Sequence, residues 1–347
     1  MGYTAITDFY WLRFPFIVMV VFIHSPGVGK IPDFVDISDI SSLSSVDYWN
    51  LFRIAFSNVL PRVAVPGFFL ISGYLFFYKC SVWNKTTYFY KLKKRFYTLF
   101  IPYVLWNVIH LLVPILMFYI LGFSNHKYTI SAQKYIESVD WIRWIWDFSF
   151  INESEENWLG IWHEYTYPIN IPLWYVRDLM VVCLLTPVIY WSIKKLKFPF
   201  LCILALAHIL EIWPNVHGLS SIGLLYFSLG AYFSINKINI IKLFRKVEVP
   251  CCVIALIVAI VLIPYNNETK IGVVKLSEIF ILAGIVPSFT ISSRLVSNRF
   301  GTINNYFCNR CFSFMLSTRC TSCFFALNSY SLFLWIGALS IVSLNIY

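Results

Sequence analysis

Four positions in this sequence place charged or titratable side chains within apolar stretches, and they are the first candidates for chemistry. They are Arg13, His24, Arg62 and the adjacent pair Arg177–Asp178. A charged residue at the centre of a membrane-spanning helix costs roughly 2.5–3.5 kcal/mol on insertion scales. Each of these residues is therefore a candidate for function by default.

Arg13 and His24 lie eleven positions apart in one apolar run. At about 100° and 1.5 Å per residue, they share one helical face and are separated by about 16 Å along the axis. Arginine binds phosphate with a rigid fork, and histidine takes a proton from a hydroxyl near neutral pH. The pair suits a reaction that spans the bilayer. The structural alternatives are an arginine that snorkels to the interface and a histidine bonded to a carbonyl at the helix end.

The other two groups have structural alternatives of similar weight. Arg62 opens a segment whose small residues, Ser72 and Gly73 among them, allow two helices to approach closely, so this segment is either a site or a packing seam. Arg177 and Asp178 point about 100° apart on a helix. They need not pair, and each is expected to find a partner on another helix.

The elements that position these residues are membrane spans. The chain has 347 residues, of which 59% are hydrophobic and 13% charged, with a mean hydropathy of +0.70. A soluble domain carries roughly 25% charged residues, so a soluble class is excluded. The sequence predicts an all-α, polytopic transmembrane bundle of about nine to ten helices, forming a single domain over residues 1–347. The first apolar run lacks a basic leader and a small-residue cleavage site, so we expect it to be retained as a helix.

The predicted helices alternate with loops of opposite charge. Helices are expected at about 10–28, 54–78, 97–122, 172–193, 198–214, 219–235, 247–264 and 276–292, with one or two more in 301–345. Every second loop is basic and the intervening loops are acidic, so the positive-inside rule places the N-terminus in the cytoplasm and the 123–171 segment outside. The net charge of +10 falls in these short clusters, which argues against nucleic-acid binding.

Two further segments leave alternatives open. Segment 123–171 contains five tryptophans among acidic residues, which is typical of an interfacial or re-entrant helix and also of a platform for a sugar. Cys308, Cys311, Cys320 and Cys323 form a pattern like that of a zinc site, but the gap between the pairs is shorter than usual. We expect no metal.

The residues singled out above resemble a known family. Arg13 and His24 enclose ten residues in LRFPFIVMVVFIHS, which resembles the R-x10-H motif of the membrane-bound acyltransferase 3 family. RVAVPGFFLISGYLFF is similar to that family's FFxxSG-Y/F motif, and KLKKRFYTLFIPY to its basic run entering the third helix. PLWYVRDL and LLYFSLGAYF resemble two further blocks. The resemblance covers roughly residues 10–235.

The resemblance implies transfer of an acyl group, commonly acetyl, from cytoplasmic acyl-CoA to a hydroxyl of a cell-surface glycan or lipid-linked sugar. It implies that His24 is the catalytic histidine and Arg13 its partner. It also implies that Ser72, Gly73 and Tyr74 line the site and that Lys94 and Arg95 lie at its cytoplasmic mouth. The further residues that we expect to bind the substrate or the donor are Arg62, Trp174, Arg177 and Asp178. No bound cofactor is expected, because acetyl-CoA is a co-substrate. Lys94 and Arg95 would meet the CoA phosphates at the cytoplasmic mouth.

The resemblance also implies a multi-pass protein of the bacterial cytoplasmic membrane, in contact with membrane lipids and compatible with a homo-oligomer. Residues 301–347 depart from the family pattern, since a Cys- and Arg-containing stretch replaces clean helices. A transporter or flippase of a glycan or lipid precursor is the main alternative, although related halves are not detectable. A non-catalytic membrane scaffold is the third.

Overall fold

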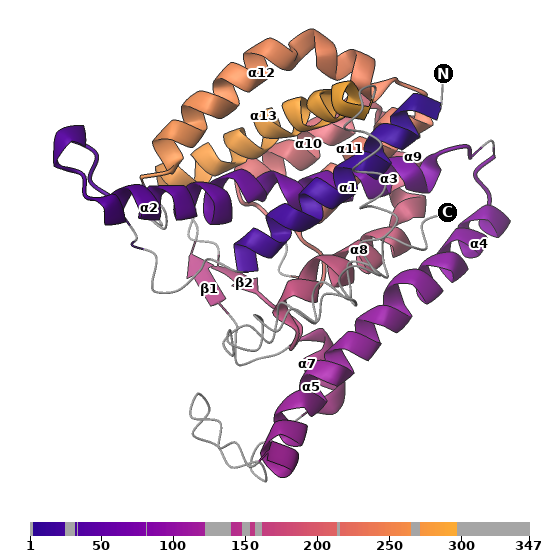
Figure 1. Ribbon diagram of the computed structural model, residues 1–347. Coiled ribbons are helices and arrows are strands. Elements are labelled where there is room, and N and C mark those ends of the chain that lie inside the picture. The colour runs from indigo at the N-terminus through magenta and orange to yellow at the C-terminus, as the bar shows by residue number, and fades with distance from the viewer. Residues whose placement is uncertain are drawn as a thin grey trace.

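The described part of the chain is a helical bundle with one short β-hairpin (Figure 1). The computed structural model describes residues 3–24, 32, 34–80, 82–121, 140–147, 153–156, 162–213, 216–264 and 271–296. Two helices there are long and apolar enough to cross a membrane, Ser45–Phe77 and Leu276–Val296. A bent helix pair gives a third span if it is counted as one, and the expected helical membrane protein is confirmed.

The first long helices are α1 (Tyr3–His24), whose apolar part Trp11–His24 is shorter than a full span, and a composite helix made of α2 (Ser45–Ile54) and α3 (Ala64–Phe77). A π-helical turn, η2 (Ala55–Val59), and a 3₁₀ turn, η3 (Leu60–Val63), join α2 to α3 without a break. A capping box at Ser44 starts α2 in the segment after the short turn η1 (Ile40–Ser42). The helix therefore begins nine residues earlier than the expected start at residue 54.

The region expected to form one helix at 172–193 is instead two helices. After the turn η6 (Ile171–Leu173), α8 (Trp174–Leu184) and α9 (Thr186–Leu196) meet at a bend of 62°. Pro187 lies in the first turn of α9, where it cannot continue the hydrogen bonding of α8. The expectation of one continuous helix over 172–193 was wrong for this reason, although the bent pair can still form one span.

The remaining helices complete the bundle. α10 (Phe198–Ile209) and α11 (Ser221–Ile235) lie near their expected positions, whereas α12 (Ile240–Leu262) starts earlier than expected, at an Asn239 cap. α12 packs along α13 (Ile271–Val296), and α13 packs against α1 (Figure 1). α4 (Lys85–Arg95), a π-helical turn η4 (Phe96–Phe100) and α5 (Ile101–Leu121) form one long helix at the edge of the bundle.

Two glycines define the closest helix contact, between α3 and α11. A Cβ atom added to Gly73 would lie 2.0 Å from the Phe227 carbonyl oxygen, and one added to Gly230 would lie 2.0 Å from that of Leu70. No side chain fits in either space, so the two backbones meet directly. The packing-seam interpretation of the 62–74 segment is therefore correct for Gly73.

Of the 123–171 segment, the described residues form a short helix and a hairpin. α7 (Trp141–Trp146) contacts α5, and β1 (Glu153–Glu156) pairs antiparallel with β2 (Trp162–Tyr165). The buried Trp144 packs with Leu111 of α5 and Ile169. This tryptophan anchors the segment to the bundle, while the interfacial-helix and sugar-platform interpretations both stay predictions.

Candidate active site

The antiparallel packing of α1 on the composite helix α2–α3 fixes the depth of the candidate residues. Three pairs of aromatic rings join the two helices: Phe9 with Tyr74, Phe16 with Phe68, and Phe22 with Phe56. Their centroid distances are 4.9, 5.5 and 6.3 Å. Residues near the end of α1 therefore lie opposite η2 and η3, and residues near its start lie opposite the end of α3.

This register separates the candidates into two levels. Arg62, in η3, lies between the Phe16–Phe68 and Phe22–Phe56 contacts, on the His24 side of Arg13. Ser72 and Tyr74 lie opposite the first half of α1, nearer Arg13. We call these depths the His24 level and the Arg13 level. Because Arg13 and His24 are eleven residues apart, the levels are separated by about 16 Å.

The two residues of α1 occupy different environments. The side chain of Arg13 is buried in the bundle, with 8% of the residue exposed, whereas His24 is half-buried in the last turn. The side chain of Arg62 is also half-buried, and its Nε donates a hydrogen bond to the Asn58 carbonyl at 2.7 Å. That bond uses one of its five donors, and the described residues accept no second hydrogen bond from this guanidinium.

α13 brings a carboxylate to the His24 level that the sequence analysis did not select. Phe289 contacts Phe9 and Phe16 at centroid distances of 5.4 and 6.5 Å, and Gly284, five residues earlier, lies against Val63 of η3. The later part of α13, around Phe289, therefore lies at the Arg13 level, and its earlier part lies toward the His24 level. Glu278, eleven residues before Phe289, lies there and within electrostatic range of Arg62.

Glu278 belongs to a chain of three polar side chains from three helices. Its Oε2 lies 2.8 Å from Nε2 of His208 in α10, and Nδ1 of the same ring lies 2.8 Å from Oγ of Ser221 in α11. The His208 side chain is 9% exposed and that of Glu278 is 20% exposed. A histidine held between a carboxylate and a hydroxyl is an arrangement that can move protons.

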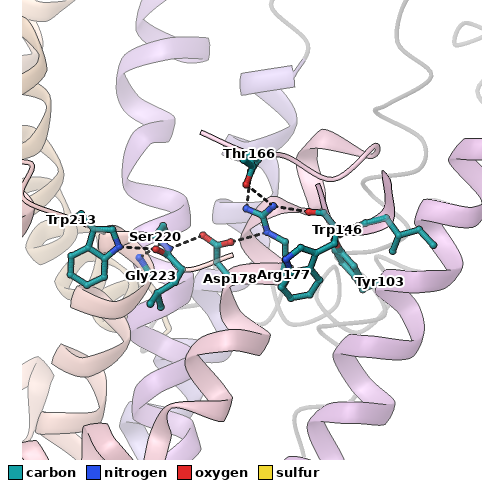
Figure 2. A network of polar contacts seen from close by, with 10 residues as sticks. Tyr103, Trp146, Thr166, Arg177, Asp178, Trp213, Ser220 and Gly223 are labelled. Atoms are coloured by element: carbon teal, nitrogen blue, oxygen red, sulfur yellow. Dashed lines mark hydrogen bonds and ion pairs between the residues drawn. The ribbon is translucent and has the colours of Figure 1, made fainter. Parts of the chain in front are cut away.

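Arg177 and Asp178 form a second network, shown in Figure 2. They pair with each other, since Arg177 Nε lies 3.2 Å from Asp178 Oδ1, although the sequence alone did not require it. Arg177 also donates to the Trp146 carbonyl at 2.9 Å and to the Thr166 carbonyl at 2.7 Å. Both residues are almost fully buried.

Asp178 links this network to the start of α11. Its Oδ2 accepts a hydrogen bond from the Ser220 N–H at 3.2 Å, and Ser220 Oγ accepts one from the Gly223 N–H at 3.1 Å as the helix cap (Figure 2). Arg177 thus holds the segments around Trp146 and Thr166, while Asp178 holds the first turn of α11. Asp178 has its expected partner on another helix. The hydrogen bonds described here for Arg177 and Asp178 are all formed with other parts of the protein.

The binding residues assigned to the Arg13 level are mostly packed. Tyr74 has its ring against Phe9 and stacks on Tyr78 at 5.8 Å, and Ser72 is buried. Trp174, at the start of α8, is half-buried against the main core. The structure therefore brings Ser72, Gly73 and Tyr74 together on α3, but it places them apart from Arg62.

A basic group lies beyond the Arg13 level, at the end of α3. Lys91 donates a hydrogen bond to the Phe76 carbonyl, and Arg95 lies 5.9 Å from the centre of the Phe76 ring. Burial lowers the pKa of Lys91 below its ordinary value. Lys94, on the same helix, is half-buried. This placement puts cations at the end of the bundle opposite His24, which suits an anionic ligand entering there.

The described residues contain no cluster of three or more His, Cys, Asp or Glu side chains arranged to hold a metal ion. The Cys308–Cys323 pattern lies outside the described residues, as do the helices expected in 301–345.

Sequence reasoning missed His208, Ser221 and Glu278. Glu278 and His208 lie inside the apolar runs expected at 276–292 and 198–214, so the rule that selected Arg13 and His24 would have selected them too. Ser221 carries no comparable signal, because a serine at a helix start is usually a cap.

Comparison with known proteins identifies a family model described as "Acyltransferase domain", which matches residues 6–347. The match therefore extends through the atypical C-terminal stretch. The succinoglycan biosynthesis protein ExoH of Rhizobium meliloti (strain 1021) is 26% identical over 296 residues, covering 84% of this chain and 71% of the relative. No solved structure matches.

Proposed function

The chain belongs to this acyltransferase family and is a membrane-bound enzyme, and on that premise we propose that it transfers an acyl group, acetyl in the first instance, from acyl-CoA to a hydroxyl of a glycan or lipid-linked sugar. The likeness to a protein named for succinoglycan biosynthesis supports a polysaccharide or its lipid-linked precursor as acceptor. The enzyme would act in the bacterial cytoplasmic membrane, in contact with its lipids.

The separation of the two levels carries this proposal. Cations on α4 lie beyond the Arg13 level, and His24 lies about 16 Å deeper than Arg13, with Glu278 at the depth of His24. That distance is comparable to the reach of a pantetheine arm. A CoA molecule with its phosphates near Lys94 and Arg95 and its pantetheine arm starting near Arg13 would therefore deliver its thioester toward the depth of His24.

The roles of the site residues follow from their chemistry and position. His24 takes the proton of the acceptor hydroxyl or relays the acyl group covalently. Arg62, with four donors beyond its bond to Asn58, stabilises the oxyanion that develops on the acyl carbonyl. Arg13, on the same face of α1, orients the donor along the path between the levels. Arg177, Asp178 and Trp174 position the helices and loop segments on the side from which the acceptor enters.

The orientation of the protein in the membrane follows from the charges of its loops. Basic residues on α4 and at the end of α9 (Lys194, Lys195) belong to the cytoplasmic side, and the acidic β-hairpin and α7 to the outside. The His24 level then faces the extracytoplasmic side, where a surface glycan is accessible.

Membranes containing the protein test the proposal directly. They are incubated with radiolabelled acetyl-CoA and a lipid-linked glycan, and label is measured on the extracted glycan together with release of free CoA. We expect both to rise in parallel and neither to rise in membranes without the protein. Glycan that moves across the membrane without CoA release would contradict the proposal and indicate a flippase.

A further inference from the structure

The hydrogen-bonded chain Ser221–His208–Glu278 has the geometry of an activated nucleophile. An activated serine has its hydroxyl within hydrogen-bond reach of a base, and a third group orients that base. Here both contacts of the His208 ring are 2.8 Å long, one to Ser221 Oγ and one to Glu278 Oε2. The three residues come from α11, α10 and α13, so their proximity is a product of the fold.

The surroundings of Ser221 favour an oxygen that gains negative charge. Ser221 is the first residue of α11, at the positive end of the helix dipole. The first turn is held in place, because the Ser220 N–H binds Asp178 and the Gly223 N–H binds Ser220 Oγ. Arg62 lies within electrostatic range of Glu278 and adds a cation near this network.

A purely structural role for these three side chains would not require a carboxylate at position 278. Polar side chains do join helices in membranes, each such bond contributing roughly 0.6–2 kcal/mol. A carboxylate within a span is more costly than that contribution, and a neutral amide would make the same bond to His208. The carboxylate is the group that stabilises a protonated imidazole, which a structural contact does not require.

Resting on the function proposed above, we propose that Ser221 carries the acyl group as an ester between donor and acceptor, with His208 as its base and Glu278 orienting His208. Two half-reactions would then replace direct transfer. The donor need not remain bound while a bulky glycan enters from the other side of the bundle.

Ser221 Oγ attacks the thioester carbonyl, its proton passes to His208, the C–S bond breaks, and CoA leaves as a thiolate that takes a proton from solvent. Glu278 stabilises the imidazolium meanwhile. The acceptor hydroxyl then attacks the acyl-serine, His24 takes its proton and releases it to solvent, and His208 returns its own proton to Ser221 as the ester bond breaks.

The test uses the full-length protein in lipid nanodiscs with radiolabelled acetyl-CoA and no acceptor. After an acid quench, peptide mass spectrometry locates the acyl group. We expect it on Ser221 in the wild-type protein and absent in Ser221→Ala, with glycan acylation by that variant reduced about 100-fold or more. Ser221→Cys should still be labelled, as a thioester that neutral hydroxylamine removes, which shows that a variant at this position folds.

Ser288→Ala is the matched control, because Ser288 is a half-buried serine in the same bundle whose Oγ donates to the Gly284 carbonyl of its own helix, at 2.8 Å. It should keep labelling and transfer. Full glycan transfer by Ser221→Ala, or the acyl group found on His24 instead, overturns this inference and leaves the proposed function standing. Label on Ser221 with no label on any glycan supports the inference and overturns the proposed acceptor.

Discussion

The two polar networks of the bundle meet at consecutive residues of α11 but use their hydrogen bonds differently. At Ser220, the Arg177–Asp178 network connects to the helix cap, and its partners are mostly backbone groups of α7, the Thr166 segment and α11. At Ser221, the other network joins three side chains, each of which can exchange a proton. A buried charged residue can thus have a structural or a catalytic role. Backbone partners indicate the structural role, and side-chain partners that exchange protons indicate the catalytic one.

The comparison predicts that disrupting the first network mainly costs stability. Arg177→Ala leaves Asp178 buried without its cation, which should destabilise the fold by about 3–5 kcal/mol. The readout is thermal unfolding in detergent, together with the amount of protein in the membrane. Replacing both residues together, as Arg177→Met and Asp178→Leu, should recover part of the loss, because no unpaired charge is then buried. If Arg177→Ala is fully stable but inactive, the structural assignment is wrong.

The second network should respond in the opposite way. Glu278→Gln keeps the shape of the side chain and a hydrogen bond to His208, so the unfolding temperature should change little. The amide cannot stabilise a protonated imidazole, and we expect acyl transfer to fall about 100-fold, which is about 2.7 kcal/mol of transition-state stabilisation. The measurement is the initial rate of CoA release with glycan present. A stability loss as large as that of Arg177→Ala would place Glu278 with the structural network.

The smallest effect is expected where the networks meet. Ser220→Ala removes the cap that accepts from the Gly223 N–H, at a cost of about 1 kcal/mol, while the backbone bond to Asp178 remains. Unfolding temperature and CoA release should both decline slightly. A loss of activity near that of Ser221→Ala, without a matching loss of stability, would show that the serine roles have been assigned to the wrong residue.

The sequence predicted what depends on apolar length and charge alternation. The spans around α10, α11 and α13 lie close to their expected ranges, because a membrane requires long apolar stretches whatever their packing. The break at Leu185 was missed, since the apolar pattern continues through Pro187 and only the bend of 62° separates α8 from α9. The early start of α2 was missed because its first turns are polar.

The site was predictable only in part for a related reason. Arg13 and His24 are on one helix, so their shared face follows from helical geometry. His208 lies 13 residues from Ser221 and 70 from Glu278, and only the packing of α10, α11 and α13 brings them together. The close contact at Gly73 likewise depends on Phe227, which no local pattern connects to it.

The assignment of His24 as the residue that performs transfer is the centre of this account, and one measurement tests it most directly. Membranes containing His24→Ala are compared with wild type for transfer of label from acetyl-CoA to the extracted glycan, at equal protein amounts. His217→Ala is the control, because the His217 ring, in the segment between α10 and α11, pairs with the Asp147 carboxylate at 3.1 Å. We expect His24→Ala to insert normally and to lose transfer, while His217→Ala keeps it. A fully active His24→Ala variant would contradict the account.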